Sequence, residues 1–444
     1  MANFRITDQQ FGPTGADRSV FEVPMIANKN GLVVTPENPF PVTVSSSATS
    51  TGSDAFGRTR ISQPLTLFDS SHRYADNGLF SEATTGTANT EFQPTEGLIN
   101  MNVGTSSGDE VIRETNKVFS YQPGKSLLIM TSFSFEPAKT NLRQRVGYFG
   151  AQNGIYLQLN DSSLSIVERS YVTGGLTESV IPQSSWSYDK LDGTGPSGIT
   201  LDITKAQIMW MDVEWLGLGN VRTGFVINGS FIVAHVFQHA NITTGTYITT
   251  GSLPLRQELT NTGVTSSNST CKQICSTVIS EGGYELRGRQ HAISIPITSA
   301  YSLTTAGTYY PVVSIRLKSA RQDAIVILTA LSLLGVGNGV NFSWRLQAGG
   351  TVTTSWTSAG SDSAVEYSIT GTAHDGGGRI LATGYVNSSN QGSPTVDILK
   401  EALFKFQLER NGLAGTTESL TLLVAAATNS QEIFASLDWE EITR

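Results

Sequence analysis

The stretch Gly224-Phe-Val-Ile-Asn-Gly-Ser-Phe-Ile-Val-Ala-His-Val-Phe237 decides the fold class of this chain. Two runs rich in β-branched and aromatic residues flank Asn228-Gly229, a dipeptide that favours a type I′ turn because both residues tolerate a positive φ. The stretch therefore predicts two antiparallel strands joined by a two-residue turn. On both sides of it, similar runs recur about every 8 to 12 residues between turn signals, which is typical of antiparallel β-sandwiches.

The composition favours the same fold class. The 444 residues include 44 glycines and 15 prolines, and 15% of the residues are charged, against about 25% in an average soluble domain. Strand formers and turn formers dominate, while long runs of helix-favouring residues are missing from the sequence. We therefore expect an all-β protein with a neutral surface that is rich in hydroxyl groups.

The sequence divides into three parts. Residues 1–60 are predicted to be an extended N-terminal arm that ends in a linker rich in serine and threonine. Residues 61–288 are predicted to form a jelly-roll-like β-sandwich, and residues 289–444 a second antiparallel β-sandwich. Asn153-Gly154 predicts another type I′ hairpin, and one short helix is expected over residues 397–403.

Charge and hydropathy exclude several classes of protein. The formal net charge is −8, and no stripe of lysine and arginine is present, so we expect no binding of nucleic acid. The first residues lack the basic and apolar regions of a signal peptide. The longest apolar run, residues 324–337, is too short to cross a bilayer and predicts a strand buried on both faces, so we expect no membrane insertion.

Three motifs with the spacing of functional signatures are better explained by turns and strands. Residues 193–198 match a dinucleotide-binding pattern, but no hydrophobic strand precedes them. Cys271 and Cys275 point to one face of a predicted strand, too far apart for a disulfide. His235 and His239 have the same spacing, which suits zinc on a helix but not on a strand. We therefore expect no cofactor and no metal.

One predicted strand carries a candidate carbohydrate site. Strand periodicity places Trp210, Asp212 and Glu214 on one face. There the three side chains either have a structural role or form a sugar site, in which the indole ring stacks on a pyranose and the carboxylates bind its hydroxyls. The stretch also resembles the catalytic strand of jelly-roll retaining glucanases. Retaining hydrolysis needs a nucleophile about 5.5 Å from the acid/base, but Trp210 occupies the nucleophile's position, so we expect that the protein is not an enzyme.

Arginines are the candidate contacts to other subunits. Arg143 and Arg145 alternate onto one face of a predicted strand, where they either clamp carboxylates of a neighbouring subunit or stay solvated on an exposed sheet. Phe56, Arg58 and Arg60, at the end of the arm, are the other interface candidates.

Several segments between residues 56 and 285 resemble virion structural proteins from tailed phages of marine and cyanobacterial hosts. These segments are Phe56–Ser62 with Phe68–Ser70, Tyr121–Ser126, Arg143–Phe149, Asp189–Gly198 and Val278–Gly283. The resemblance implies a particle component that is assembled in the host cytoplasm, and it supplies no catalytic residues.

From this resemblance we expect a non-enzymatic structural component of a tailed-phage virion, a tail, neck or fibre protein anchored by its N-terminal arm. The alternatives are a capsid decoration protein and a carbohydrate-binding adhesin that recognises the host. The expected partners are other virion proteins, further copies of this chain, since virion parts are built by symmetry, and a host-surface glycan.

Overall fold

The computed structural model describes residues 3–5, 22–24, 63–389 and 406–443. The chain separates into two compact units, residues 1–61 and residues 62–444. In the first unit, β1 (Asn3–Arg5) pairs antiparallel with β2 (Glu22–Pro24). Phe56, Arg58 and Arg60, together with the helix expected over residues 397–403, lie outside the described residues.

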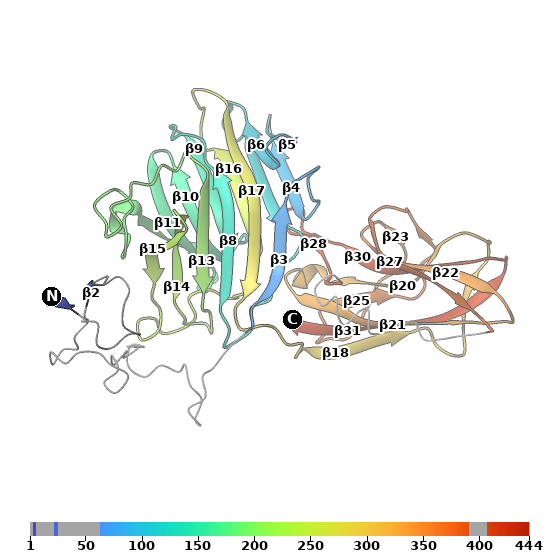
Figure 1. Cartoon of the computed structure of the whole chain (residues 1–444). Coiled ribbons are helices and arrows are strands. Elements are labelled where there is room, and N and C mark those ends of the chain that lie inside the picture. Colours follow the sequence, from blue (N-terminus) through green and yellow to red (C-terminus); the bar gives the residue numbers. More distant parts are fainter. Residues whose placement is uncertain (1–2, 6–21, 25–62, 390–405, 444) are drawn as a thin grey trace, which may run out of the picture. The chain divides into compact units, whose positions relative to one another are not determined.

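The second unit contains two antiparallel β-sandwiches, as the sequence predicts (Figure 1). A seven-stranded and an eight-stranded sheet form the first sandwich. The seven strands, in order across the sheet, are β12 (Thr177–Pro182), β11 (Ser163–Ser170), β10 (Gly154–Asn160), β9 (Leu142–Phe149), β16 (Leu255–Asn261), β7 (Glu110–Thr115) and β4 (Phe80–Thr85).

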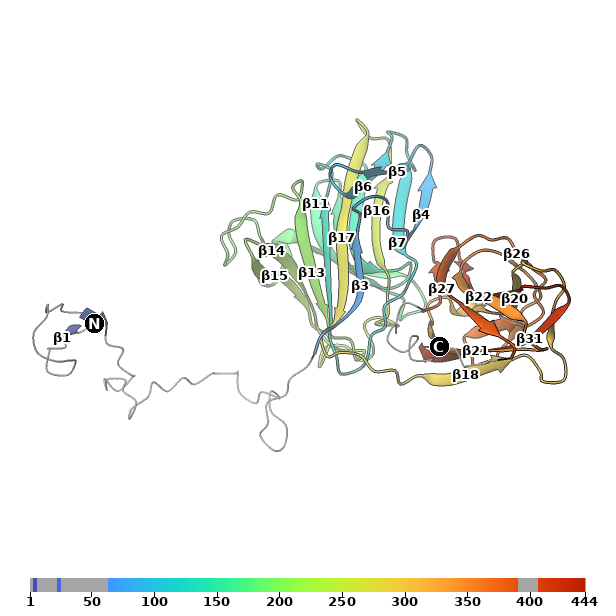
Figure 2. The ribbon, with the colours of Figure 1, turned by 45° about the vertical axis from the view of Figure 1, so that its right-hand side comes forward.

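The eight-stranded sheet carries the hairpin that turns at Asn228-Gly229. Its path is β15 (Ser230–Phe237), β14 (Val221–Ile227), β13 (Gln207–Val213), β8 (Leu127–Ser134), β17 (Ser269–Ser280), β6 (Leu98–Val103) and β5 (Asn89–Gln93). The eighth strand, β3 (Leu65–Ser71), pairs with β17 and lies beside it in Figure 2.

The second sandwich has a six-stranded and a four-stranded sheet. The six strands are β24 (Thr357–Ser358), β25 (Val365–Ser368), β20 (Tyr310–Leu317), β30 (Ser419–Ala426), β22 (Asn341–Ala348) and β27 (Arg379–Asn387). The four are β18 (Arg289–Ser294), β31 (Gln431–Thr443), β19 (Tyr301–Leu303) and β21 (Ile325–Gly335).

Short elements complete the described structure. Two small ladders join β23 (Val352–Thr353) to β26 (Ala373–His374) and β28 (Arg410–Asn411) to β29 (Thr416–Thr417). Single 3₁₀ turns cover Gln183–Ser185 and Ser319–Arg321. Within the described ranges, no helix is both long and apolar enough to cross a membrane.

Each sandwich buries its own apolar core between its sheets. In the first, β8 alternates strictly between buried and half-buried residues, because successive side chains of a strand point to opposite faces. In the second, the first four residues of β21 are all buried. Val326 packs in the main core and Ile325 in a separate cluster with Val118. The prediction of a strand buried on both faces is therefore confirmed for residues 325–328, but not farther along β21, where Ser332 and Leu334 are exposed.

The two Asn-Gly pairs have different backbone conformations. Asn228 and Gly229 have φ of 52° and 76° and join β14 to β15 through the pair Ile227–Ser230, so this two-residue turn is as predicted. The type I′ turn predicted at Asn153-Gly154 is wrong. Gly154 already pairs with Phe149 in the ladder, so the loop between them consists of the four residues 150–153. A hydrogen bond from the Gly150 N–H to the Asn153 carbonyl at 2.9 Å closes this loop.

A β-bulge separates the two cysteines. The register of β17 against β8 shifts between Gln273 and Cys275, so the inward and outward positions exchange after the bulge. Cys271 is buried in the first core and Cys275 is exposed. The prediction that the two cysteines share one face is therefore wrong.

Candidate functional site

The structure does not bring Trp210, Asp212 and Glu214 together as a sugar site. Trp210 is 4% exposed and packs edge-on against Phe231, with 5.5 Å between the ring centroids. Asp212 is also buried, and its Oδ2 accepts a hydrogen bond from Nε of Arg222 at 2.9 Å. This packing leaves no open indole face on which a pyranose could stack.

Glu214 lies beyond the strand, because β13 ends at Val213. Its backbone N–H donates to the carbonyl of Asn220 at 3.1 Å, within the turn that leads to β14. Glu214 is exposed, and its neighbour Trp215 is half-buried. The alternation that groups Glu214 with Trp210 applies only while the chain remains a strand.

Arg143 and Arg145 share the outer face of β9, but this chain supplies their carboxylate partners. Nη1 of Arg145 lies 3.3 Å from Oε2 of Glu258, and Nη2 of Arg143 lies 4.0 Å from Glu110. Burial would raise the pKa of Glu258, but the charges of Arg256 and Arg145 hold it below its usual range. The pairing predicted across a subunit boundary thus occurs within the sheet.

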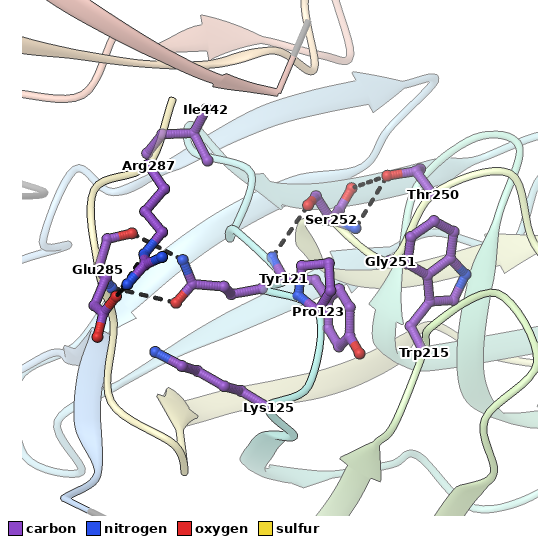
Figure 3. A pocket seen from close by; sticks show the side chains of 11 residues that line it. Tyr121, Pro123, Lys125, Trp215, Thr250, Gly251, Ser252, Glu285, Arg287 and Ile442 are labelled. Atoms are coloured by element: carbon purple, nitrogen blue, oxygen red, sulfur yellow. Dashed lines mark hydrogen bonds and ion pairs between the residues drawn. The ribbon is translucent and has the colours of Figure 1, made fainter. Parts of the chain in front are cut away.

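A pocket of about 610 Å³ opens beyond the end of β13 (Figure 3). Its volume lies in the range of about 300 to 1,000 Å³ that is common for small-ligand sites. We call it the Trp215 pocket, and its lining residues are Tyr121, Gln122, Pro123, Lys125, Trp215, Thr250, Gly251, Ser252, Glu285, Arg287 and Ile442.

Two aromatic rings form one wall of the pocket. Tyr121 and Trp215 meet edge to face with 5.6 Å between their centroids. The backbone of Gly251 lies against the indole, because a Cβ added there would be 2.8 Å from Cγ of Trp215. The Tyr121 hydroxyl accepts a hydrogen bond from the Leu216 N–H at 3.1 Å, and burial raises the pKa of Tyr121, so the phenol stays neutral.

The indole N–H of Trp215 is a buried donor that has no hydrogen-bond partner among the described residues. A buried polar group without a partner costs roughly 1 to 3 kcal/mol. Because this nitrogen has almost no accessible surface, the ring of Trp215 and not its N–H lines the pocket.

Hydrogen bonds between distant segments fix the polar wall. The Tyr121 N–H donates to Oγ of Ser252 at 3.1 Å. The Gln122 amide pairs with the backbone of Glu285, donating to its carbonyl at 2.8 Å and accepting from its N–H at 3.2 Å. These bonds hold three loops in one arrangement, so the pocket is preformed.

Of the three charged side chains that line the pocket, two form an ion pair with each other and the third does not. Nε of Arg287 donates to Oε2 of Glu285 at 2.6 Å, and both side chains are well exposed. Lys125 lies over Gly282, where an added Cβ would be 2.6 Å from its Cγ, and it makes no ion pair with any described residue. The pocket therefore offers one free cation beside its aromatic wall.

The remaining motifs have structural roles. The Asp189 carboxylate accepts hydrogen bonds from the N–H groups of Leu191 and Ser197, each at 2.8 Å, which organises the glycine-rich loop as a turn. Nδ1 of His235 accepts from the Ser187 N–H at 3.2 Å. Over the part of the chain that the structure describes, no group of three or more His, Cys, Asp or Glu side chains could hold a metal ion.

Comparisons with known proteins give structural neighbours of low similarity. No protein-family model and no curated protein matches the chain. The similar solved structures include the carbohydrate recognition domain of Emp47p (9% identity, TM-score 0.31, 52% of this chain and 99% of that chain). They also include a legume lectin-like domain from Entamoeba histolytica (10%, 0.28, 50% and 99%) and a glycosyl hydrolase family protein from Mycobacterium fortuitum (9%, 0.29, 50% and 100%). These TM-scores are too low to support an inference about fold or function.

Sequence reasoning missed Tyr121 and Trp215 as site residues. Tyr121 lies in a loop after β7, and Trp215 occupies a position that strand alternation assigns to the core. Four of the lining residues lie in the segment Tyr121–Ser126.

Proposed function

We propose that this protein binds carbohydrate in the Trp215 pocket. The observation that carries the proposal is the aromatic wall formed by Tyr121 and Trp215, beside amide, hydroxyl and ammonium groups. The apolar face of a sugar ring stacks on an aromatic ring, while its hydroxyl groups need fixed donors and acceptors. Convergent polar groups around an apolar surface are the usual composition of a small-molecule site.

We propose further that the pocket binds without hydrolysis. Glycosidases of both stereochemical classes use a pair of carboxyl groups flanking the scissile bond. Of the described residues that line the pocket, Glu285 is the one with a carboxylate, and Arg287 neutralises it. Incubation with any polysaccharide that binds should release no new reducing ends, and measurable release that Glu285→Gln abolishes would contradict this proposal.

Variants inside and outside the pocket test the binding proposal. The wild type, Trp215→Ala and Phe231→Ala are applied to an array of neutral and acidic bacterial capsular and lipopolysaccharide glycans. Phe231 is a matched control because it is aromatic, 55% exposed and outside the pocket. We expect Trp215→Ala to lose at least about tenfold in affinity, or about 1.4 kcal/mol, and Phe231→Ala to bind as the wild type does. Equal loss in both variants, or binding unaffected by Trp215→Ala, would contradict the proposal.

We also propose that the protein is a structural component of a tailed-phage virion, either in the tail, neck or fibre or as a capsid decoration protein. The resembling segments support it, and two of them meet at the pocket. Tyr121–Ser126 lines it, and the Glu281 N–H of Val278–Gly283 donates to the Ser126 carbonyl at 3.0 Å. Immunogold labelling of purified particles tests this assignment, since label on the tail, neck, fibre or capsid supports it and unlabelled particles would contradict it.

Self-association is part of the virion assignment. We propose a homo-oligomer held by residues 1–60. Mass photometry of the full chain and of a chain lacking these residues tests it. A discrete oligomer that dissociates without the arm supports the proposal, and a monomer in both cases contradicts it.

A further inference from the structure

A buried histidine lies behind the wall of the Trp215 pocket. His239 is 4% exposed and stacks face to face on Tyr247, with 3.8 Å between the ring centroids and 4° between the planes. Its Nδ1 lies 2.7 Å from the carbonyl oxygen of Gly219, and its Nε2 lies 2.7 Å from Oε2 of Glu168. Both neighbours at these distances are acceptors.

The two acceptors define the charge of this ring. A neutral imidazole has one N–H and one lone pair, so it would place a lone pair against either the Gly219 carbonyl or the Glu168 carboxylate. An imidazolium donates to both. Both hydrogen bonds form when Nδ1 carries one proton and the Nε2–Glu168 contact carries another; with Glu168 ionised, this is a doubly protonated His239 in a buried ion pair.

His239 contacts the turn that carries Trp215. The N–H groups of Leu218 and Gly219 donate to the Trp215 carbonyl at 2.9 and 2.6 Å, and the Tyr247 N–H donates to the Gly217 carbonyl at 3.0 Å. The imidazolium thus holds one end of the turn through Gly219, and its stacking partner Tyr247 holds the middle.

We propose that protonated His239 positions the indole of Trp215, so that the affinity of the pocket for carbohydrate falls when His239 loses a proton. The affinity part of this inference rests on the proposed function. Loss of the proton leaves one acceptor unpaired, and the loss of the Gly219 contact frees the turn that aligns the indole. His239 acts through Trp215 and is a positioning residue.

The surrounding charges determine the pH range. Burial would lower the pKa of His239, but the hydrogen bond and charge of Glu168, with the Gly219 carbonyl, outweigh it and raise the pKa above its ordinary value. Among the described residues, Tyr247 is the other titratable group against the ring. Burial, and next the charge of Glu168, raise the pKa of Tyr247. The charge of Glu214, just beyond the end of β13, also raises the pKa of Tyr247. The tyrosine stays neutral at ordinary pH, so the contribution of His239 is complete at low pH and is lost as the pH rises through its pKa.

Two ligand-free measurements between pH 5.5 and 9 test the positioning role. NMR of ¹³C-labelled histidine rings follows His239, which is assigned with His239→Gln. The fluorescence emission of Trp215 is obtained by subtracting the spectrum of Trp215→Phe from that of the wild type. We expect the His239 ring to titrate above pH 6.5, the ordinary histidine value, and the Trp215 emission to change with the same midpoint. Glu168→Gln should lower that midpoint, while His235→Gln should leave it unchanged.

The third measurement is affinity for a polysaccharide that binds on the array, at pH 6 and pH 8.5. We expect a loss of at least about fivefold at the higher pH, the lower end of common coupling between sites, and no such loss in His239→Gln. A His239 ring that titrates at or below pH 6.5, or Trp215 emission that does not follow it, would overturn the inference. If no polysaccharide binds at either pH, the proposed function fails, and the ring and emission data still decide the positioning role.

Discussion

At the scale of residues, burial separates the chemistry of the two cysteines. Cys271 is 0% exposed, and burial raises the pKa of its thiol to about 12. Cys275 lies beyond the bulge and is exposed. Because the thiolate is the nucleophile, the two side chains should differ strongly in their reaction with thiol reagents.

We predict that one thiol per chain reacts rapidly with a disulfide reagent at pH 8 in the folded protein, and that two react in guanidinium. Cys275→Ser should remove the rapid reaction and leave Cys271 to react at the rate of unfolding. Two rapid thiols in the folded wild type would show that the bulge does not separate the cysteines.

The site residues mark the limit of sequence periodicity. Alternation correctly places Trp210 and Asp212 on the face of β13 opposite Met209, Met211 and Val213, which are buried in the first core. The alternation along β13 does not show how deeply Phe231 and Arg222 cover Trp210 and Asp212, because these covering side chains come from the other strands β15 and β14. Trp215 lies after the strand ends, so its direction depends on the turn and on contacts with Tyr121 and Gly251.

At the scale of elements, local turn chemistry explains which predictions are confirmed. The hairpin at Asn228-Gly229 is specified by its own two residues, both of which have a positive φ. At Asn153 the side chain bonds instead to the distant Thr249, with Oδ1 accepting from its N–H at 3.1 Å and Nδ2 donating to its hydroxyl at 2.7 Å. Tertiary contacts determine that loop, and a sequence window does not contain them.

We predict that Gly229→Ala destabilises the protein by about 1 kcal/mol, because an alanine at φ of 76° is strained by roughly 1 to 2 kcal/mol. Gly245→Ala is the matched control, since Gly245 has no positive φ and nothing within 4 Å of an added Cβ. Urea unfolding of both variants checks the prediction. Equal free energies of unfolding would mean that the β14–β15 turn is not the one described.

At the scale of the whole molecule, the second unit contains buried contacts between residues of its two sandwiches. Nη1 of Arg410 donates to Oε1 of Glu114 at 2.6 Å, and Arg256 donates to the other carboxylate oxygen at 3.0 Å. Nε2 of Gln407 donates to the carbonyl of Val118 at 2.9 Å. Both arginines lose a partner if this carboxylate loses its charge.

We predict that Glu114→Gln lowers the free energy of unfolding by about 3 kcal/mol, the lower end of the cost of breaking a buried ion pair. Glu96→Gln is the control, because its partner Lys272 forms a largely exposed pair worth about 1 kcal/mol or less. Urea unfolding compares the two, and a loss of less than about 1 kcal/mol in Glu114→Gln would show that these contacts contribute little.

The central claim is that carbohydrate binds at the Trp215 pocket, and photo-crosslinking tests it most directly. A polysaccharide that binds the wild type is converted to a photoreactive derivative, crosslinked to the full chain and mapped by peptide mass spectrometry. We predict labels on the segments that line the pocket, residues 121–125, 215, 250–252 and 285–287, and their loss with excess unmodified polysaccharide. Competable labels confined to the outer face around Trp210 and Phe231, or to the second sandwich, would contradict the claim.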